Sequence, residues 1–248
     1  MDVLTSQCNR MIASWRGKHI ASDADLDREL SAYRIRYAYN SGRIENQSIT
    51  YHDTREVFEN GALVGYSGDV RSLFEIQNLK RSYDFMIDAF GRAARIDESM
   101  VLEWHRVLTE GTYDEHRWRM GERPGSYKRN AYVVGAMDAG LPPEAVGEGV
   151  RSLLAELDAA TPDNILTVAA YFHASFEAIH PFADGNGRCG RELMNYLFVT
   201  HGHPPIIVFD DDKLSYYGAM EVWDAEGDLE PMKLFLKAEL VKTWDSIL

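Results

Sequence analysis

Hydrophobic residues recur at helical spacing along most of the chain. Between residues 165 and 179 they return every three or four positions, which gives a helix one apolar face; they are Ile165, Val168, Ala169, Phe172, Phe176 and Ile179. The preceding Thr161-Pro162-Asp163 combines a capping hydroxyl, a proline and an acid, and predicts that this helix starts there. A second apolar pattern predicts a helix that begins near Gly187 or Arg188 and stops at Gly202.

The same periodicity predicts that most of the remaining chain is helical. The expected segments span residues 25–40, 50–60, 69–93, 97–110, 146–157, 213–225 and 231–245. Residues 131–134 form the clearest strand-like stretch, which is short enough to indicate only a local hairpin. No linker rich in Pro, Gly or Ser divides the chain. The predicted architecture is therefore mainly α, with one small β-hairpin.

The charge balance narrows the class of protein. Lys and Arg total 26 against 39 Asp and Glu, a net charge of −13. An acidic protein does not attract phosphate backbones or anionic membranes, so we expect no nucleic acid and no membrane among its partners. No apolar stretch approaches the length of a bilayer span, and the first eight residues lack the pattern of a signal peptide. Two cysteines are too few for a disulfide framework, so the sequence predicts a cytoplasmic protein.

One loop between two predicted helices, residues 180–191, gathers groups suited to phosphate chemistry. Gly185 and Gly187 let a ligand approach the backbone, and the helix that follows offers N–H groups that can hold an anion. Arg188 and Arg191 add two positive charges for phosphate oxygens. The sequence therefore predicts an anion-binding cradle at the start of this helix.

Two more residues of the loop add chemistry to the cradle. Asp184 could hold Mg²⁺, which takes one or two carboxylates together with phosphates and water. His180 lies at the beginning of the loop and is suited to act as a general base near pH 7. Each feature alone has an ordinary alternative: residues 185–187 as a turn, His180 as a helix-end residue, and the arginines as partners of surface acids. Their combination favours a phosphate-handling site.

Residues 180–191 resemble the signature of the Fic family, His-Pro-Phe-x-Asp/Glu-Gly-Asn-Gly-Arg-x-x-Arg, with every fixed position matched. The resemblance extends from about residue 30 to residue 240. Residues 124–135, followed by 141–143, are similar to the β-hairpin flap of the family. Residues 75–78 and 104–108 resemble its supporting helices. The resemblance implies the Fic/Fido helical fold with a small β-hairpin flap.

The resemblance also implies protein AMPylation, the transfer of AMP from ATP to a Tyr, Thr or Ser hydroxyl of a target protein with release of pyrophosphate. His180 would take the proton from that hydroxyl, Asp184 would hold the Mg²⁺ that bridges the phosphates, and Arg191 would bind the γ-phosphate. The other implied nucleotide contacts are Gly185, Asn186, Gly187, Arg188, Val133, Val134, Gly135, Tyr216, Tyr217 and Asp224, the last standing where Asn is commoner in the family. An extended segment of the target protein would dock by strand addition at about residues 131–136.

Residues 41–46, Ser-Gly-Arg-Ile-Glu-Asn, match the inhibitory pattern of the family, Ser/Thr-x-x-x-Glu-Gly/Asn. The match implies that Glu45 pairs with Arg191 in place of the γ-phosphate, while Ser41 braces the helix. An exposed glutamate at a helix end is the ordinary alternative. We therefore expect an N-terminal helical region over residues 1–60, which carries this motif and packs on a Fic catalytic domain over residues 61–248.

Other functions stay open from the sequence. The same site could remove AMP from a modified protein, with Glu45 aligning the water, as in some Fic proteins that carry an inhibitory glutamate. Transfer of phosphate or phosphocholine is less favoured, because residues 185–188 and Arg191 match the pattern for ordinary ATP binding. A nucleotide-sensing interaction module is the non-enzymatic alternative. Self-AMPylation and a homodimer are further possibilities that the resemblance implies, and we expect His173 to be a structural residue.

Overall fold

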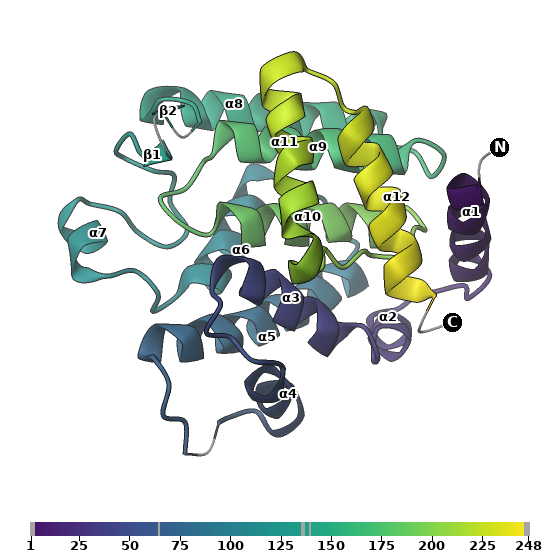
Figure 1. Cartoon of the computed structure of the whole chain (residues 1–248), viewed down its shortest axis with the longest axis horizontal. Coiled ribbons are helices and arrows are strands. Elements are labelled where there is room, and N and C mark those ends of the chain that lie inside the picture. Colours follow the sequence, from purple (N-terminus) through teal and green to yellow (C-terminus); the bar gives the residue numbers. More distant parts are fainter. Residues whose placement is uncertain (1–2, 64, 135–136, 139, 246–248) are drawn as a thin grey trace.

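The computed structural model describes residues 3–63, 65–134, 137–138 and 140–245, with the backbone alone for 133–134 and 137–138 (Figure 1). Helices dominate this part of the chain. They are α1 (Val3–Arg16), α2 (Asp23–Glu29), α3 (Arg34–Glu45), α4 (Tyr51–Asn60), α5 (Val70–Gly91), α6 (Glu98–Thr109), α7 (Glu115–Arg119), α8 (Pro143–Glu156), α9 (Ile165–Ile179), α10 (Asn186–Thr200), α11 (Lys213–Glu226) and α12 (Glu230–Trp244), with two 3₁₀ turns at Leu157–Ala159 and Asp210–Asp212. The mainly α architecture predicted from the sequence is confirmed.

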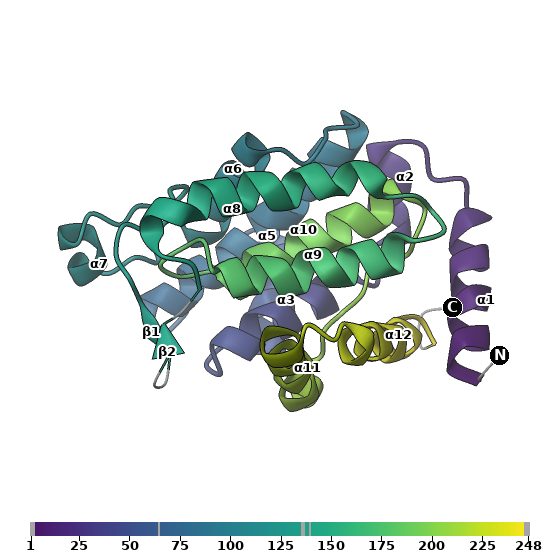
Figure 2. The same cartoon turned by 90° about the horizontal axis from the view of Figure 1, so that it is seen from above.

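Helix α10 lies in the middle of the molecule, surrounded by α3, α5, α6 and α9 (Figures 1 and 2). Its apolar residues Leu193, Met194, Tyr196, Leu197, Phe198 and Val199 are buried, and so is Asn195 between them. Its first two turns are buried as well, yet they contain Arg188 and Arg191. Burying two guanidinium groups is unfavourable unless acceptors surround them. The start of α10 is therefore where a functional site is expected.

The N-terminal segment differs from the single helix predicted over residues 25–40. Helix α2 ends at Glu29, and a separate α3 begins at Arg34. Between them Leu30 and Tyr33 are buried, and the Tyr33 hydroxyl donates a hydrogen bond of 3.2 Å to the carbonyl of Ile206. Burying these two side chains requires the chain to change direction, which a hydrophobic pattern alone did not reveal. Helices α1 and α7 were not predicted either.

Two predicted helix starts have different outcomes. Thr50 accepts a hydrogen bond from the Asp53 N–H, and α4 ends at Asn60, as predicted, with Gly61 in a left-handed conformation (φ 77°) directly after it. The start predicted at residues 161–163 is wrong, because α9 begins only at Ile165. The Thr161 N–H donates to Asn164 Oδ1 at 2.7 Å, and the Asn164 N–H donates to the Thr161 hydroxyl. These reciprocal bonds close a turn before the helix.

The hairpin predicted around residues 131–134 has a short backbone counterpart. Strand β1 (Val133–Val134) pairs antiparallel with β2 (Met137–Asp138), with Val133 opposite Asp138. Gly135 lies outside the described residues. Because the pairing spans only two residues on each side, the existence of a flap that binds a target protein stays a prediction.

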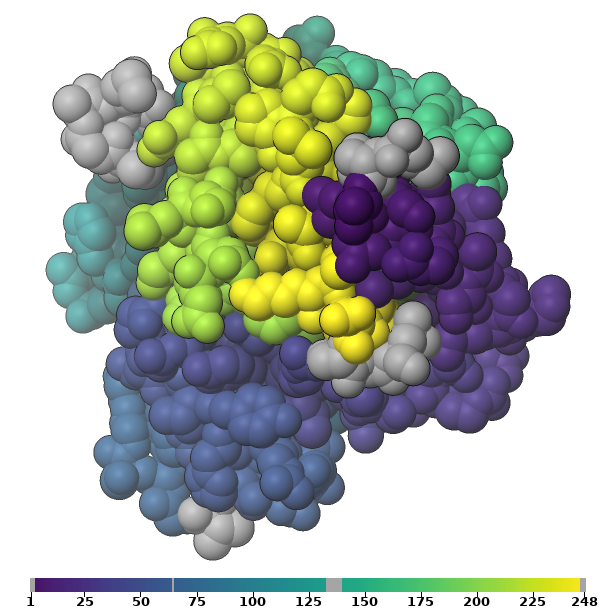
Figure 3. Space-filling model, turned by 45° about the vertical axis from the view of Figure 1, so that its right-hand side comes forward, coloured from purple at the N-terminus to yellow at the C-terminus, as the bar shows by residue number. Residues whose placement is uncertain are grey.

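The N-terminal helices pack on the rest of the chain, as Figure 3 shows for α1 (purple) against α12 (yellow). The ring of Trp15 lies 5.2 Å from that of Trp244, and the ring of Tyr33 also stacks on Trp244. The boundary at residue 60 stays a prediction. Within the described ranges, no helix is both long and apolar enough to cross a bilayer.

Candidate active site

A cavity of about 490 Å³ opens where the loop between α9 and α10 meets α3, α7 and α11. Its lining combines the predicted loop with residues from distant parts of the chain. The lining residues are Glu45, Arg117, Glu177, His180, Ala183, Asp184, Gly185, Asn186, Gly187, Arg191, Tyr216, Tyr217 and Met220. The fold therefore brings most of the predicted site residues together with the predicted inhibitory glutamate.

His180 ends α9 in a left-handed backbone conformation (φ 49°), which turns the chain out of the helix and into the loop. Its side chain is half-buried and lines the cavity. Burial, followed by the nearby charge of Lys128, lowers the pKa of His180 to about 4. The imidazole is therefore neutral at pH 7, which is the form that a general base requires.

The loop after His180 is held in place by bonds to its backbone. The side-chain amide of Asn186 accepts from the Phe182 N–H and donates to the Phe182 carbonyl, both at 2.8 Å. Asn186 was predicted to contact phosphate, but its side chain is used as a brace of the loop. Gly185 adopts a left-handed conformation (φ 83°) at the start of α10, where a Cβ would come 2.7 Å from Thr109 Cγ2.

His105 supports the same loop from α6. Its Nδ1 accepts a hydrogen bond from the Gly125 N–H at 2.9 Å, so Nε2 carries the proton and donates to the Asp184 carbonyl at 2.9 Å. The ring also stacks on Phe182 at 3.6 Å. Burial lowers the pKa of His105 to about 3, so the ring stays neutral. His105 thus positions the backbone of the predicted metal-binding residue.

Three arginines face the carboxylate of Asp184. Arg71 Nη2 lies 2.6 Å from Oδ2, Arg188 Nη2 lies 3.2 Å from Oδ1, and Arg117 Nη2 lies 3.7 Å from Oδ2. Burial alone would raise the pKa of Asp184, but Arg188, Arg71 and Arg117 lower it below its usual value. The carboxylate is therefore ionised, and both of its oxygens have guanidinium partners.

Within the described part of the chain, no group of three or more His, Cys, Asp or Glu side chains could hold a metal ion by itself. Asp184 alone nevertheless suits Mg²⁺, which needs few protein ligands when phosphate oxygens and water complete its octahedron. The residues present therefore fit the cation, with phosphate oxygens and water as its remaining ligands. Arginine contacts at Asp184 would have to be exchanged when the cation binds.

Arg191 is 1% exposed and is held by the end of α3. Its Nε donates to the Ser41 hydroxyl at 3.1 Å, and its Nη2 donates to the Ser41 carbonyl at 2.9 Å and to Glu45 Oε1 at 2.8 Å. Tyr216 lies beside the guanidinium, with its hydroxyl 3.5 Å from Nη1. Burial would lower the pKa of Arg191, but Tyr216 and Glu45 raise it above its ordinary value. The guanidinium therefore keeps its charge in the interior.

The carboxylate of Glu45 lies directly over the first turn of α10. A Cβ added at Gly187 would collide with Glu45 Oε1 and would stand 2.9 Å from Arg191 Nη1. The Glu45 side chain is still 33% exposed, so it reaches the site from the solvent side. An anion bound at the N-terminus of α10 would compete for this position, because the free N–H groups of the first turn and Arg191 converge there.

Three of the implied nucleotide contacts, Tyr216, Tyr217 and Asp224, differ in burial and in their distance from the cavity. Tyr216 is buried and its hydroxyl bonds to His173 Nε2 at 2.6 Å, which makes His173 a structural residue as expected. Tyr217 is 39% exposed and lines the cavity. Asp224 is exposed and is not among the described residues of the lining, so its role stays a prediction.

The sequence did not single out three charged residues of the site. Arg71 and Arg117 come from helices far from the loop, and nothing in their local sequence marks them. Glu177 precedes His180 by three positions, so a helical pattern could have placed both on the same side of α9. Burial raises the pKa of Glu177 to about 8, and no described residue bonds to its Oε1.

The fold and this cavity define a mainly helical protein in which the start of α10, a neutral histidine and a carboxylate partly covered by arginines line one cavity. Residues 95–198 match the model of the Fic/DOC family. This segment of the chain is thus similar to the Fic/DOC family, and it contains the loop of residues 180–191.

Several curated relatives carry the name protein adenylyltransferase Fic, and two of them illustrate the similarity. The one from Drosophila persimilis is 30% identical over 235 residues, which cover 92% of this chain and 43% of that protein. The one from Drosophila ananassae is 28% identical over 258 residues, covering 98% of this chain and 49% of that protein. The chain therefore spans less than half the length of these relatives.

Two solved structures share the fold. A Fic domain containing signaling protein from Bacteroides thetaiotaomicron superposes with a TM-score of 0.78 at 23% identity, over 96% of this chain and 93% of that one. Fic-1 from C. elegans, residues 134–508, superposes with a TM-score of 0.77 at 21% identity, over 99% of this chain and 73% of that one. Both support the all-helical Fic fold.

Proposed function

We propose that the protein is an adenylyltransferase that transfers AMP from ATP to a hydroxyl side chain of a target protein and is autoinhibited by Glu45. One observation carries this proposal: a neutral His180, the Asp184 carboxylate and the N-terminus of α10 line one cavity, and Glu45 covers the same helix start. The relatives named protein adenylyltransferase support the same reaction.

The chemistry follows from the charges in the cavity. His180 accepts the proton of the incoming hydroxyl, because its lowered pKa keeps the ring neutral at pH 7. The N–H groups at residues 185–187 and the two arginines of α10 hold the phosphates and stabilise the charge that develops on them. When Mg²⁺ is bound at Asp184, it supplies charge neutralisation between the phosphates. Placement and electrostatics then provide most of the rate enhancement.

Glu45 suppresses this reaction by occupying Arg191. The bond of 2.8 Å between Glu45 Oε1 and Arg191 Nη2 engages the guanidinium that would otherwise bind the γ-phosphate. Because the Glu45 carboxylate also lies over Gly187, a triphosphate cannot settle fully on the helix start. ATP would then bind with its α-phosphate misdirected, so transfer stays slow until Glu45 leaves.

The partners of the proposed reaction are ATP and a target protein that docks near residues 131–136. Self-AMPylation would use a hydroxyl of the same chain or of a second copy, and a homodimer would bring such a copy close. These partners are part of the proposal. The chain spans less than half the length of its curated relatives, so their partners do not transfer directly to it.

Intact-mass spectrometry tests the proposal. The wild type, Glu45→Gly and the double variant that combines Glu45→Gly with His180→Ala are each mixed with ATP, Mg²⁺ and cell lysate. We expect AMP adducts on the enzyme or on lysate proteins to increase at least tenfold for Glu45→Gly and to disappear when His180→Ala is added to that variant. The matched control is Glu226→Gly, which removes an exposed glutamate from the end of α11. Folded Glu45→Gly protein that forms no more adduct than the wild type would contradict the autoinhibition.

Removal of AMP from a modified protein is a second candidate. It is favoured by the position of Glu45, whose carboxylate stands inside the cavity and is partly exposed, where it could align a water molecule. An AMPylated substrate protein incubated with the wild type and with Glu45→Gly separates the two reactions. Loss of AMP from the substrate with the wild type alone would favour hydrolysis, whereas gain of AMP with Glu45→Gly alone favours transfer.

A further inference from the structure

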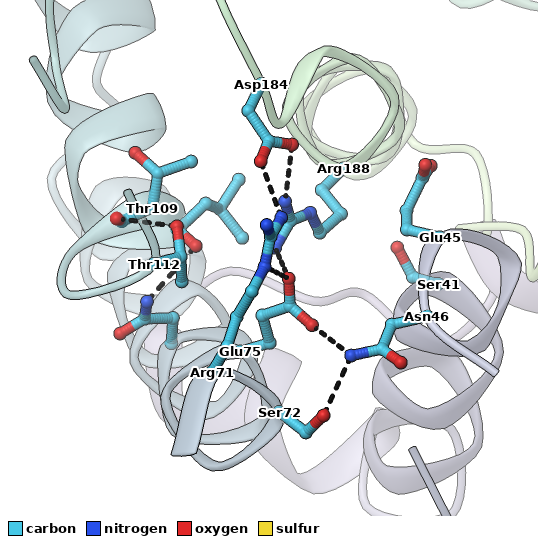
Figure 4. A network of polar contacts seen from close by, with 12 residues as sticks. Ser41, Glu45, Asn46, Arg71, Ser72, Glu75, Thr109, Thr112, Asp184 and Arg188 are labelled. Carbon is cyan, nitrogen blue, oxygen red and sulfur yellow. Dashed lines mark hydrogen bonds and ion pairs between the residues drawn. The ribbon is translucent and has the colours of Figure 1, made fainter. Parts of the chain in front are cut away.

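Arg71 makes the shortest of the described contacts to Asp184. Its Nη2 donates to Asp184 Oδ2 at 2.6 Å, across 113 positions of the sequence, from the first turn of α5 (Figure 4). Arg188 occupies the other oxygen, Oδ1, at 3.2 Å. The side of the carboxylate on which a cation would bind thus faces two guanidinium groups.

A buried glutamate fixes the position of Arg71. Glu75 is 2% exposed, and its Oε1 accepts from Arg71 Nε at 3.0 Å and lies 3.4 Å from Arg188 Nη1. Its Oε2 accepts from the amide of Asn46 at 2.7 Å, next to the inhibitory glutamate. Figure 4 shows Glu75 between these three side chains. The Arg71 guanidinium therefore bridges two carboxylates, one from its own helix and one from the loop.

Only one of the three arginines is placed to leave. The Arg188 side chain is 2% exposed and enclosed by the core, whereas the Arg71 side chain is 39% exposed. Arg117 stands farther from Asp184, at 3.7 Å, and is bound to Asp114 at 2.6 Å. When Arg71 moves away from Asp184, its Nε keeps the bond to Glu75. Its guanidinium therefore stays paired with a carboxylate after the cation has replaced it at Asp184.

We propose that Arg71 is a positioning residue for the cation-binding carboxylate, holding the place of the divalent cation at Asp184 Oδ2 until the cation displaces it. This inference rests on the proposed function only in taking Asp184 as the cation ligand. The resting carboxylate stays oriented toward the cavity, since Arg71 binds its Oδ2 while His105 holds the backbone carbonyl of the same residue. Cation binding must overcome this ion pair, which weakens the site and restrains the reaction independently of Glu45.

Cation affinity measured without nucleotide tests the inference. Mn²⁺ alone is titrated into the protein and followed by electron paramagnetic resonance, so that no turnover is needed. Arg71→Gln removes the competing guanidinium but keeps a polar side chain, and we expect it to bind Mn²⁺ roughly fivefold more tightly than the wild type, the value of one partly exposed ion pair. Arg71→Lys cannot bridge both carboxylates, so a smaller gain is expected.

Two variants separate this effect from a general change of charge. Arg81→Gln lies on the same helix and pairs with Glu110, so it should leave Mn²⁺ affinity unchanged. Arg117→Gln removes a positive charge from the cavity with only the longer contact to Asp184, and we expect at most a twofold gain. An Arg71→Gln affinity equal to that of the wild type, or a gain no larger than that of Arg117→Gln, would overturn the inference.

Asp184→Asn distinguishes this failure from a failure of the proposed function. If Asp184→Asn abolishes Mn²⁺ binding while Arg71→Gln changes nothing, Asp184 remains the cation ligand and only the role of Arg71 is wrong. If Asp184→Asn binds Mn²⁺ as the wild type does, the cation site itself is wrong, and both the inference and the metal part of the proposed function fail.

Discussion

The carboxylate of Glu45 lies over Gly187, so closely that a Cβ at position 187 would collide with its Oε1 in this arrangement. The contact joins the last turn of α3 to the first turn of α10, two segments separated by more than 140 positions. It also gives a reason for a glycine inside a helix, where glycine is unfavourable. The glycine accommodates whichever anion occupies the helix start.

Gly187→Ala should therefore weaken nucleotide binding even when Glu45 is absent. In the Glu45→Gly background, the added methyl group occupies the space over the first turn of α10, and we expect the affinity for a non-hydrolysable ATP analogue to fall at least tenfold. Isothermal titration calorimetry measures this affinity. Gly218→Ala on α11, where a Cβ meets nothing within 4 Å, is the control. Unchanged affinity in Gly187→Ala would contradict an anion site at this turn.

Ser41→Ala should destabilise the protein, because the Ser41 hydroxyl accepts from the Nε of a buried arginine. Leaving a charged donor unpaired in the interior costs about 1–3 kcal/mol. Urea unfolding measures the loss, with Ser48→Ala, an exposed position near the end of the same helix, as the control. If Ser41→Ala and Ser48→Ala unfold at the same urea concentration, Ser41 does not hold Arg191 in solution.

Asn46→Ala should loosen the segment that carries Glu45. The Asn46 amide donates to Ser72 at 2.9 Å and to Glu75 at 2.7 Å, and these bonds tie the end of α3 to α5. Without them we expect faster hydrogen exchange over residues 41–49 and a gain in AMP transfer several times smaller than that of Glu45→Gly. Protection factors equal to those of the wild type would show that Glu45 needs no such anchor.

The stability of the protein should decrease as the pH falls below neutrality. The folded-state pKa of His105, about 3, lies below its unfolded value of about 6.5, so the unfolded chain binds the proton more readily. The stabilisation is therefore complete above pH 6.5 and is lost as the pH falls toward 3. Between pH 7 and pH 5 this single group accounts for about 2 kcal/mol.

His105→Gln isolates this contribution. The variant lacks the titrating ring, so the difference in unfolding free energy between wild type and variant should shrink by about 2 kcal/mol from pH 7 to pH 5. His19→Gln, an exposed position, is the control. A difference that stays constant over this range would mean that the ring is protonated in the folded protein.

The sequence predicted the central pair of helices and the loop between them, because a long apolar period and a dense cluster of glycine, acid and arginine are both local signals. It also predicted the partnership of Glu45 with Arg191, through a resemblance and not through spacing. The bond of 2.8 Å between them agrees with that prediction. Local signals were sufficient wherever the chemistry lies within a few turns of one segment.

The features that the sequence did not predict depend on contacts between residues far apart in the chain. Arg71 reaches Asp184 across 113 positions, and nothing in the sequence around Arg71 distinguishes it from the surface arginines of the same helix. The break between α2 and α3 depends on the burial of Tyr33 against Ile206, another distant contact. The role of the Asn186 side chain, which bonds to the backbone of Phe182, was not predicted either, and a phosphate contact of the Asn186 backbone stays a prediction.

The left-handed backbone at His180 has a consequence for any variant designed to abolish the proposed reaction. A residue with a Cβ adopts φ near 50° only at a cost, and asparagine accepts it more readily than alanine does. His180→Ala removes the imidazole but also places an alanine in a left-handed conformation that alanine adopts less readily. His180→Asn removes the same proton acceptor with a residue that suits this conformation. For trapping a target protein of the proposed reaction, His180→Asn is thus a better inactive variant than His180→Ala, because it preserves the backbone conformation at position 180.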